Sequence, residues 1–334
     1  MPKKLSDAMD KSGKPSSTAD TPRQHVSWLR WVGTIAALGL LVYLLAQQGW
    51  DEFAQAIATI PAWAFLAAFA CLFGSRLTTV GRWLALLRAA DVHIATWDAF
   101  KLVFAGLFAA NFLPTTIGGD VVRLAGAVQL RLDGGIVTAS LIVDRLVGMA
   151  GMATLLPLEL PRVLREGLPA LKSATDVNFA AALPGILQPA WKKLNDFIAT
   201  ILKSLVHWVR RPIGLLKALL WTYGHMACVF GAVWFFLTGM GEPLSFWKIG
   251  GLWVLAYFIT LLPVSINGLG VQELSIAVLY STFGGVSQQT GLALAVLMRM
   301  LYMLASLPGA LFLPGLLQRR SQPPETGTDE GVQS

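Results

Sequence analysis

Two polar interruptions inside long apolar stretches constrain the fold of this chain more than any other feature. The first runs from Asn111 to Asp120 (NFLPTTIGGD) and the second from Pro263 to Glu273 (PVSINGLGVQE). Proline removes a backbone donor, and glycine permits turns that a helix does not. Within hydrocarbon, broken backbone persists only where it is buried in protein or lines a wet cavity, and a charge adds a further penalty. We therefore expect the two breaks to form a site.

The composition indicates a membrane as the surrounding medium. Of the 334 residues, 55% are hydrophobic and 13% are charged, and the mean hydropathy is +0.60. A soluble domain carries roughly 25% charged residues, so we expect an integral membrane protein. The formal net charge of +7 does not indicate a nucleic-acid partner, because the basic residues lie mostly in tails and between apolar runs, where they meet anionic lipid.

Apolar runs of about 20 residues are long enough to cross a bilayer as helices. The sequence predicts an all-α, polytopic membrane protein with six or seven full spans and two re-entrant half-helices. Apolar runs that span or enter the membrane are predicted at 29–48, 61–87, 97–113, 136–158, 213–240, 247–262 and 291–317. The returning half-helices are predicted at 118–131 and 271–284.

The domain organisation is one transmembrane domain, 28–318, between two polar tails. Residues 1–27 and 319–334 are predicted to be disordered, and the basic residues of the first favour a cytoplasmic N-terminus. The stretch 159–212 is weakly patterned, and part of it could lie in the interface or add a crossing near 178–200. A simple span count puts this basic stretch outside, against the positive-inside tendency, so the exact topology stays open.

The two breaks resemble each other, which suggests a repeat. Each has a proline, then glycines, then an acid, and each is followed by an arginine in the next span. The residues are Pro114, Gly118, Gly119, Asp120 and Arg145 in the first half, and Pro263, Gly268, Gly270, Glu273 and Arg299 in the second. Transporters built from inverted repeats carry interrupted helices at matching places, with the site between them. The alternative is coincidence, because proline and glycine are common in membrane helices.

Charged residues inside the apolar runs are the main candidates for function. Asp144 and Arg145 are adjacent on a predicted helix, so they point in different directions and need separate partners. We expect Asp144 to pair with Arg123, and Arg145 to pair with Asp120 or Glu273. The alternative is structural, with pairs that fix helix register or arginines that reach the interface. Arg82, near a helix end, is expected to be structural, and Arg76 is left undecided.

The chemistry of these residues suits a phosphate headgroup. Arginine binds phosphate bidentately, and the start of each half-helix directs free N–H groups into the cavity. The carboxylates could bind an amine or hydroxyls, or carry a proton. The predicted substrate-binding or gating residues are Asn111, Asp120, Arg123, Asp144, Arg145, Asn267, Glu273 and Arg299.

No catalytic constellation or cofactor motif is visible in the sequence. His225 stands alone in an apolar span and is expected to be a hydrogen-bonded packing residue. Cys71 and Cys228 lie in apolar runs and are expected to act as small buried hydrophobes, without metal-ligand spacing. We expect neither an enzyme nor a bound metal.

Four motifs, in this order, carry a resemblance to a known family. They are Asn111–Arg123, Val143–Gly148, Leu262–Glu273 and Arg299–Tyr302. Together they resemble the lysylphosphatidylglycerol synthase transmembrane-region family over nearly all of the chain except its tails. The matching site residues are Asn111, Pro114, Gly118, Gly119, Asp120, Arg123, Asp144, Arg145, Asn267, Gly268, Gly270, Glu273 and Arg299.

The resemblance implies a bacterial inner-membrane protein related to the flippase half of enzymes that aminoacylate phosphatidylglycerol and move it outward. It does not imply the synthase activity, which resides in a separate C-terminal domain, whereas this sequence stops soon after its last predicted span. Stand-alone members are linked to diverse lipid-linked substrates, so the substrate does not carry over.

Three functions remain open at this stage. The first is a flippase for an anionic phospholipid or a lipid-linked substrate, with the headgroup between the two re-entrant helices. The second is a proton-coupled transporter of a small solute. The third is a non-transporting subunit that serves a separate synthase or glycosyltransferase.

Overall fold

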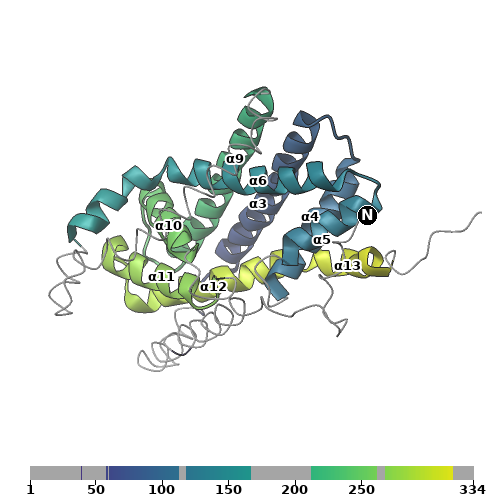
Figure 1. The fold of residues 1–334 in the computed structure, drawn as a ribbon. Helices are drawn as coiled ribbons and strands as arrows, with labels where there is room; N and C mark the ends of the chain where they lie inside the picture. The colour runs from purple at the N-terminus through teal and green to yellow at the C-terminus, as the bar shows by residue number, and fades with distance from the viewer. Residues whose placement is uncertain are drawn as a thin grey trace, which may run out of the picture.

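The computed structural model describes residues 39, 58, 60–112, 118–166, 212–261 and 268–318. Regular structure in these ranges is helical, and no strand occurs among them. Both predicted tails, the predicted span at 29–48 apart from residue 39, and the central stretch after residue 166 lie outside the described residues. The helices are α3 (Ala62–Ala89), α4 (Thr96–Phe112), α5 (Gly118–Gln129), α6 (Gly134–Ala153), α9 (Pro212–Gly239), α10 (Phe246–Thr260), α11 (Val271–Leu279), α12 (Gln288–Ser306) and α13 (Pro308–Gln318) (Figure 1).

Four of the described helical segments are long and apolar enough to cross a membrane. They are Ala62–Ala89, Gly134–Leu158, Pro212–Gly239 and Gln288–Ser306. The second includes a short 3₁₀ turn, η1 (Leu156–Leu158), after α6. This number is below the six or seven predicted, partly because the first predicted span is not described. It is also lower because α4 has 17 residues and α10 has 15, since each ends at a break.

The prediction of one uninterrupted span over 291–317 is wrong. Helix α12 ends at Ser306 and α13 begins at Pro308. Proline has no N–H for the preceding turn, and its ring clashes with the carbonyl of that turn. Helix α13 then packs on α4 at Gly309, where a side chain would collide with the carbonyl oxygen of Phe104.

The chain reverses at each break, so that the flanking helices pack against each other as hairpins. In the first hairpin, α4 and α5 meet at Gly106 and Gly119, and a Cβ on Gly119 would lie 2.6 Å from the Gly106 carbonyl oxygen. In the second, the Tyr280 hydroxyl donates to the Ile249 carbonyl at 2.9 Å, which ties α10 to the π-helical turn η3 (Tyr280–Gly284) after α11. The helices on either side of both predicted breaks therefore fold as anticipated.

The loops that precede the two hairpins have the same backbone geometry. The Val92 amide donates to the Leu87 carbonyl at 2.9 Å, and the Glu242 amide donates to the Leu237 carbonyl at 2.9 Å, 150 residues later in each case. Both α3 and α9 have 28 residues. The helices after the hairpins, α6 and α12, both begin with a side-chain cap that accepts from the amide three residues on. The structure thus repeats one four-helix order twice.

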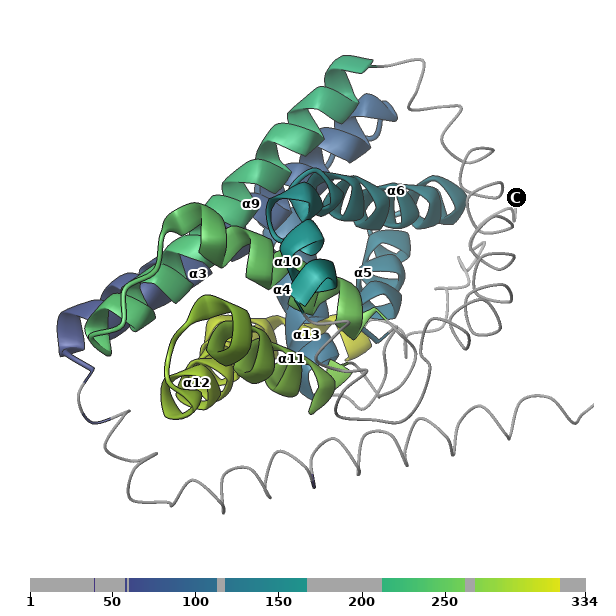
Figure 2. The same ribbon diagram turned by 90° about the vertical axis from the view of Figure 1, so that its left-hand side faces the viewer.

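Helices α3 and α9 pack along each other (Figure 2). Their residue contacts show that they run in opposite directions and obey a two-fold relation. Gly81 faces Trp221, and Cys71 faces Gly231. Adding 150 to Cys71 and to Gly81 gives Trp221 and Gly231, so each contact is the copy of the other. The same relation links the contact of Ala64 with Gly239 to the contact of Ala89 with Gly214. The axis passes near Arg76, midway between Cys71 and Gly81.

The two largest apolar clusters among the described residues build most of the interior. One joins α9 to α10, α11 and α12 through residues such as Phe236, Leu252 and Met298. The second joins α3, α4 and α6 through residues such as Trp83, Phe104 and Val137. The polar side chains described next lie between these clusters, in a setting where charges need partners.

Candidate functional site

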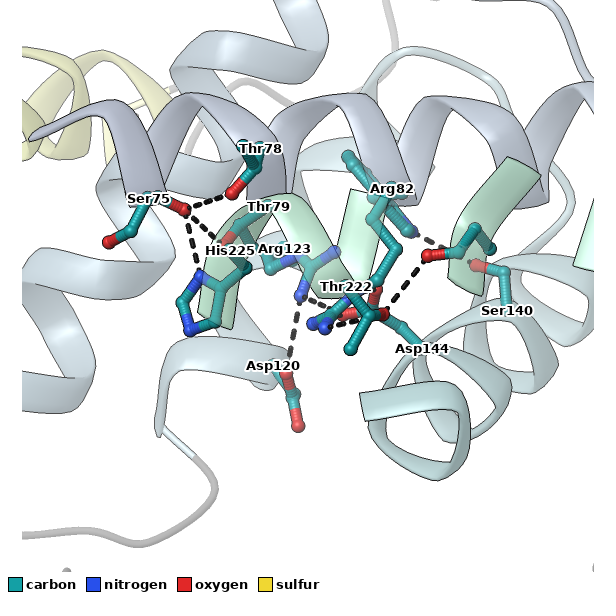
Figure 3. Close-up of polar contacts among 12 residues, drawn as sticks. Ser75, Thr78, Thr79, Arg82, Asp120, Arg123, Ser140, Asp144, Thr222 and His225 are labelled. Atoms are coloured by element: carbon teal, nitrogen blue, oxygen red, sulfur yellow. Dashed lines mark hydrogen bonds and ion pairs between the residues drawn. The ribbon is translucent and has the colours of Figure 1, made fainter. Parts of the chain in front are cut away.

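Asp144 is the centre of a buried ionic network that joins three helices (Figure 3). Only 3% of this residue is exposed. One carboxylate oxygen accepts from Arg82 Nε on α3 at 2.7 Å, and the other accepts from Arg123 Nη1 on α5 at 3.4 Å. Two arginines around one acid leave a net positive charge, which suits an anionic ligand.

Asp120, in the first turn of α5, forms a second ion pair at the edge of this network. Its carboxylate accepts from Arg145 Nε on α6 at 2.7 Å, and Arg123 lies 3.8 Å from its other oxygen. The Arg123 guanidinium also lies over the Trp83 ring, 4.4 Å from the centroid. Arg123 therefore bridges Asp120 and Asp144, while two of its nitrogens have no hydrogen-bond partner in the described structure.

Glu273 and Arg299 form the corresponding pair in the second half. Glu273 lies in the first turn of α11 and accepts a hydrogen bond from Arg299 Nε on α12. Its other oxygen accepts from the Gly270 amide at 2.8 Å. Gly268 and Gly270 have φ of 70° and 77°, a conformation that favours glycine and explains both residues at this break. An acid at the start of the returning helix thus binds an arginine of the next helix in both halves.

The two halves differ around these pairs. Arg145 and Arg299 are 154 residues apart, so Asp144 corresponds to Met298 in the second half. The long helices α3 and α9 are related by 150 residues, so Arg82 corresponds to Ala232. The charged network therefore belongs to one half, and among the described residues the second half retains the pair of Glu273 with Arg299.

Arg76 lies at the two-fold axis and has no acidic partner among the described residues. Only 7% of it is exposed, and its Nε has no hydrogen-bond partner there. Its guanidinium lies over the Tyr302 ring of α12, 4.5 Å from the centroid. The ring supplies some stabilisation, but no carboxylate in the described ranges balances this cation.

A cavity of about 290 Å³ opens beside Arg76, between the two hairpins. It is lined by residues of both halves, including Arg76, Asn111, His225, Gln272, Arg299 and Tyr302. One Arg299 nitrogen is buried without a partner in the described structure. The two arginines give the cavity unpaired N–H donors, and this is an arrangement that can hold a phosphate or another oxyanion.

The expected pairings are present. Asp144 pairs with Arg123, and Arg145 pairs with Asp120 rather than with Glu273. The Asn111 amide donates to Ser306 Oγ at 3.0 Å, so it ties α4 to α12 while it lines the cavity. Gly118 begins α5 and Gly119 packs against α4. Pro114, Pro263 and Asn267 lie outside the described residues.

The sequence analysis does not identify Tyr302 as a cavity residue or name the partner of Arg82. Arg82 pairs with Asp144, which is compatible with the structural role expected for it, and it makes the shortest contact to that acid. A buried acid that needs a partner is a signal, but the sequence does not tell which neighbouring span supplies it. His225 was expected to be a packing residue, and its Nδ1 donates to the Ser75 carbonyl at 3.0 Å, although the ring also lines the cavity.

Residues 30–309 match the family described as the lysylphosphatidylglycerol synthase TM region. The chain belongs to this family. The match covers every described helix up to the start of α13, and with the apolar helices it identifies a multi-pass membrane protein. What matches is a transmembrane region and not a synthase domain. No curated protein matches the chain in sequence.

Within the described ranges, no group of three or more His, Cys, Asp or Glu side chains could hold a metal ion. The free thiols of Cys71 and Cys228 face glycines at the crossing of α3 and α9. The charged side chains and the cavity are the features that define the candidate site.

Proposed function

We propose that the protein moves the polar headgroup of a phospholipid or lipid-linked substrate across the membrane. The headgroup occupies the cavity between the hairpins, while the acyl chains remain in the bilayer. The family supports a lipid substrate, because its name refers to a lipid. The resemblance further suggests the bacterial inner membrane, with a cytoplasmic N-terminus.

Arg76 is the observation that carries this proposal. A buried charge without a counterion is strongly unfavourable, so such a group persists where a ligand supplies the opposite charge. No described carboxylate pairs with Arg76, and by sequence the break segments 113–117 and 262–267 contain no acid. An anionic headgroup would provide the missing partner.

The size of the cavity limits what it holds. Sites for small molecules run from about 300 to 1,000 Å³, and this cavity is at the lower limit. A phosphate with a small polar substituent fits this volume better than a whole lipid. The acyl chains would then pass out between the helices.

We propose that the two halves have inverted topology in the membrane and that both hairpins are re-entrant. The antiparallel packing of α3 and α9 supports this arrangement. Trp97 and Trp247, 150 residues apart, are the second residues of α4 and α10 and are 59% and 67% exposed. Exposed tryptophans mark the two membrane interfaces, so the hairpins would enter from opposite sides.

The matching ion pairs are proposed as gates of the cavity. The Arg145 side chain is 58% exposed, whereas the Arg299 side chain is 18% exposed. This difference favours a state in which the pair with Asp120 is accessible and the pair with Glu273 is closed. Exchange of the two states would move the headgroup past Arg76.

A vesicle assay tests the proposal directly. The purified chain is reconstituted into phosphatidylcholine vesicles that contain phosphatidylglycerol with a fluorescent label on an acyl chain. A quencher that cannot cross the membrane is then added, and the decrease in fluorescence is measured over time. We expect transfer faster than in empty vesicles, and slower transfer for Arg76→Gln. The matched control is Arg131→Gln, which removes an exposed charge outside the cavity.

The same assay addresses the two alternative functions. A proton-coupled solute transporter would leave lipid transfer at the level of empty vesicles. A non-transporting subunit of a lipid- or glycan-modifying complex would do the same, and Arg76→Gln would then leave that complex active. Either result would reject the lipid translocase.

A further inference from the structure

A second cavity lies away from the headgroup site, on the outside of the α3 and α9 pair. Its volume is about 810 Å³. The walls are largely apolar and come from α3, α9 and the start of α4, with Leu77, Leu84, Ala85, Phe100, Ile213 and Trp221 among them. We call this cavity the α3–α9 groove.

The α3–α9 groove carries positive charge at one end. Arg88 lies in the last turn of α3, and Lys217 lies in the second turn of α9. Both side chains are exposed and line the groove, and neither has an acidic partner among the described residues. No described residue that lines the groove is acidic. The groove therefore offers two cations without a described acidic partner above an apolar trough.

The length of the groove fits one leaflet of a bilayer. Its lining on α3 runs from Leu77 to Arg88, eleven residues apart. At 1.5 Å per residue this distance is about 16 Å, or roughly half of the 30 Å hydrocarbon core. Arg88 lies at the end of a helix that is long enough to span the membrane, so the cations lie near the interface and the trough runs toward the midplane.

The internal repeat does not reproduce this groove. With the offset of 150 residues, Arg88 corresponds to Thr238 and Lys217 corresponds to Ala67. The corresponding place also differs in shape, because Phe230 packs edge-on to Phe246 there. The feature is specific to one side of the molecule, whereas a by-product of the shared fold would occur on both sides.

From these observations we infer that the α3–α9 groove binds one anionic phospholipid of the surrounding bilayer. Its phosphate lies between Arg88 and Lys217, and one acyl chain follows the trough toward Trp221. This bound lipid is separate from the transported headgroup at Arg76. A soluble anion would not need a trough of leaflet length, and a neutral lipid would not need the two cations.

Native mass spectrometry of the full chain in detergent tests this inference, with phosphatidylglycerol and phosphatidylcholine of identical acyl chains as probes. We expect one phosphatidylglycerol to be retained in preference to phosphatidylcholine. Each basic residue near a membrane surface contributes about a fivefold attraction to anionic lipid. Arg88→Gln and Lys217→Gln should each weaken phosphatidylglycerol binding about fivefold, and the double variant should remove the preference.

Two further variants separate a groove from a charged surface. Ala85→Phe fills the trough and keeps both cations, so it should release the bound phosphatidylglycerol. Ala85→Leu adds a smaller side chain and should weaken phosphatidylglycerol binding partly. This variant replaces Ala85→Phe in the test if Ala85→Phe lowers the Tm. Arg131→Gln, which removes an exposed charge outside the groove, should leave binding unchanged.

Three results would overturn the inference. The first is equal retention of the two lipids by the wild type. The second is undiminished phosphatidylglycerol binding in folded Ala85 variants, which would indicate surface attraction alone. The third is equal loss in Arg131→Gln and in the groove variants. None of these results depends on whether the protein transports lipid.

Discussion

The Arg76 guanidinium on α3 lies over the Tyr302 ring on α12, and this contact joins the two halves of the protein beside the central cavity. The ring face attracts a cation but does not neutralise it. Arg76 is therefore held in place without a described counterion. Arg82, two turns along the same helix, differs because it is paired with Asp144. Neutralising Arg76 and neutralising Arg82 should therefore have opposite effects on the stability of the protein.

Arg76→Gln should fold at least as stably as the wild type and should lose headgroup binding. Removal of a buried, unpaired charge relieves a desolvation cost. A charge-assisted hydrogen bond to phosphate contributes about 1.5–3 kcal/mol, so transfer of labelled phosphatidylglycerol should fall roughly tenfold or more. The measurements are the free energy of unfolding in mixed micelles and the vesicle assay. Transfer at the wild-type rate would return Arg76 to a structural role.

Arg82→Gln should instead destabilise the protein. Asp144 would lose its closest partner and keep only the longer contact to Arg123, so the loss should lie below the ~3–5 kcal/mol that it costs to leave a buried charge without any partner. The double variant Arg82→Gln, Asp144→Asn should lose less stability than the two single variants together, because neither charge is left behind. Unfolding of all four proteins in mixed micelles provides the cycle. Additive losses would show that the two side chains do not interact.

Most of the helical order could be predicted from the sequence, because the breaks and apolar runs act locally. The predicted half-helices at 118–131 and 271–284 correspond to α5 and to α11 with its π-helical turn. The error at Pro308 arose because a proline in a membrane helix either kinks or ends it. The choice depends on Gly309, which lets α13 turn onto α4. That packing partner lies about 200 residues away in sequence.

The components of the candidate site and two of its ion pairs could be predicted from the sequence, but the partner of Arg82 could not. Adjacent Asp144 and Arg145 had to face different ways, which correctly led to Arg123 and Asp120 as partners. Arg82 was expected to be structural, but its partner could not be named, because the rotation of α3 against α6 decides whether Arg82 reaches Asp144. The two-fold relation of α3 and α9 was also hidden, since small residues such as Gly81 and Gly231 show their role only once the helices are paired.

Glu273→Gln and Glu273→Ala should separate the two roles of Glu273. The carboxylate pairs with Arg299 and also accepts from the Gly270 amide. Glutamine can still accept from the amide, so Glu273→Gln should fold and transfer lipid slowly. Alanine loses this hydrogen bond as well and should be less stable than Glu273→Gln by about 1 kcal/mol. Equal stability of the two variants, measured by unfolding in mixed micelles, would contradict a capping role.

Gly119→Ala tests whether close approach of α4 and α5 positions the charges. The added Cβ would lie 2.6 Å from the Gly106 carbonyl oxygen, and backbone cannot move aside as a flexible side chain can. Overpacking of this kind costs about 1–3 kcal/mol. The forced separation would also move Asp120 and Arg123, both on α5, away from α6, so transfer of labelled lipid should slow with the loss of stability.

Gly74→Ala is the matched control, because it is also a helical glycine at a helix–helix contact. Its Cβ would lie 3.5 Å from the Cys228 sulfur, an ordinary contact. Alanine favours a helix over glycine by about 1 kcal/mol, so Gly74→Ala should be as stable as the wild type or slightly more stable. The two variants thus differ in the sign of the change in unfolding free energy. If both were neutral, α5 would have room to shift, and the hairpin contact could not be what holds Asp120 and Arg123 in register with α6.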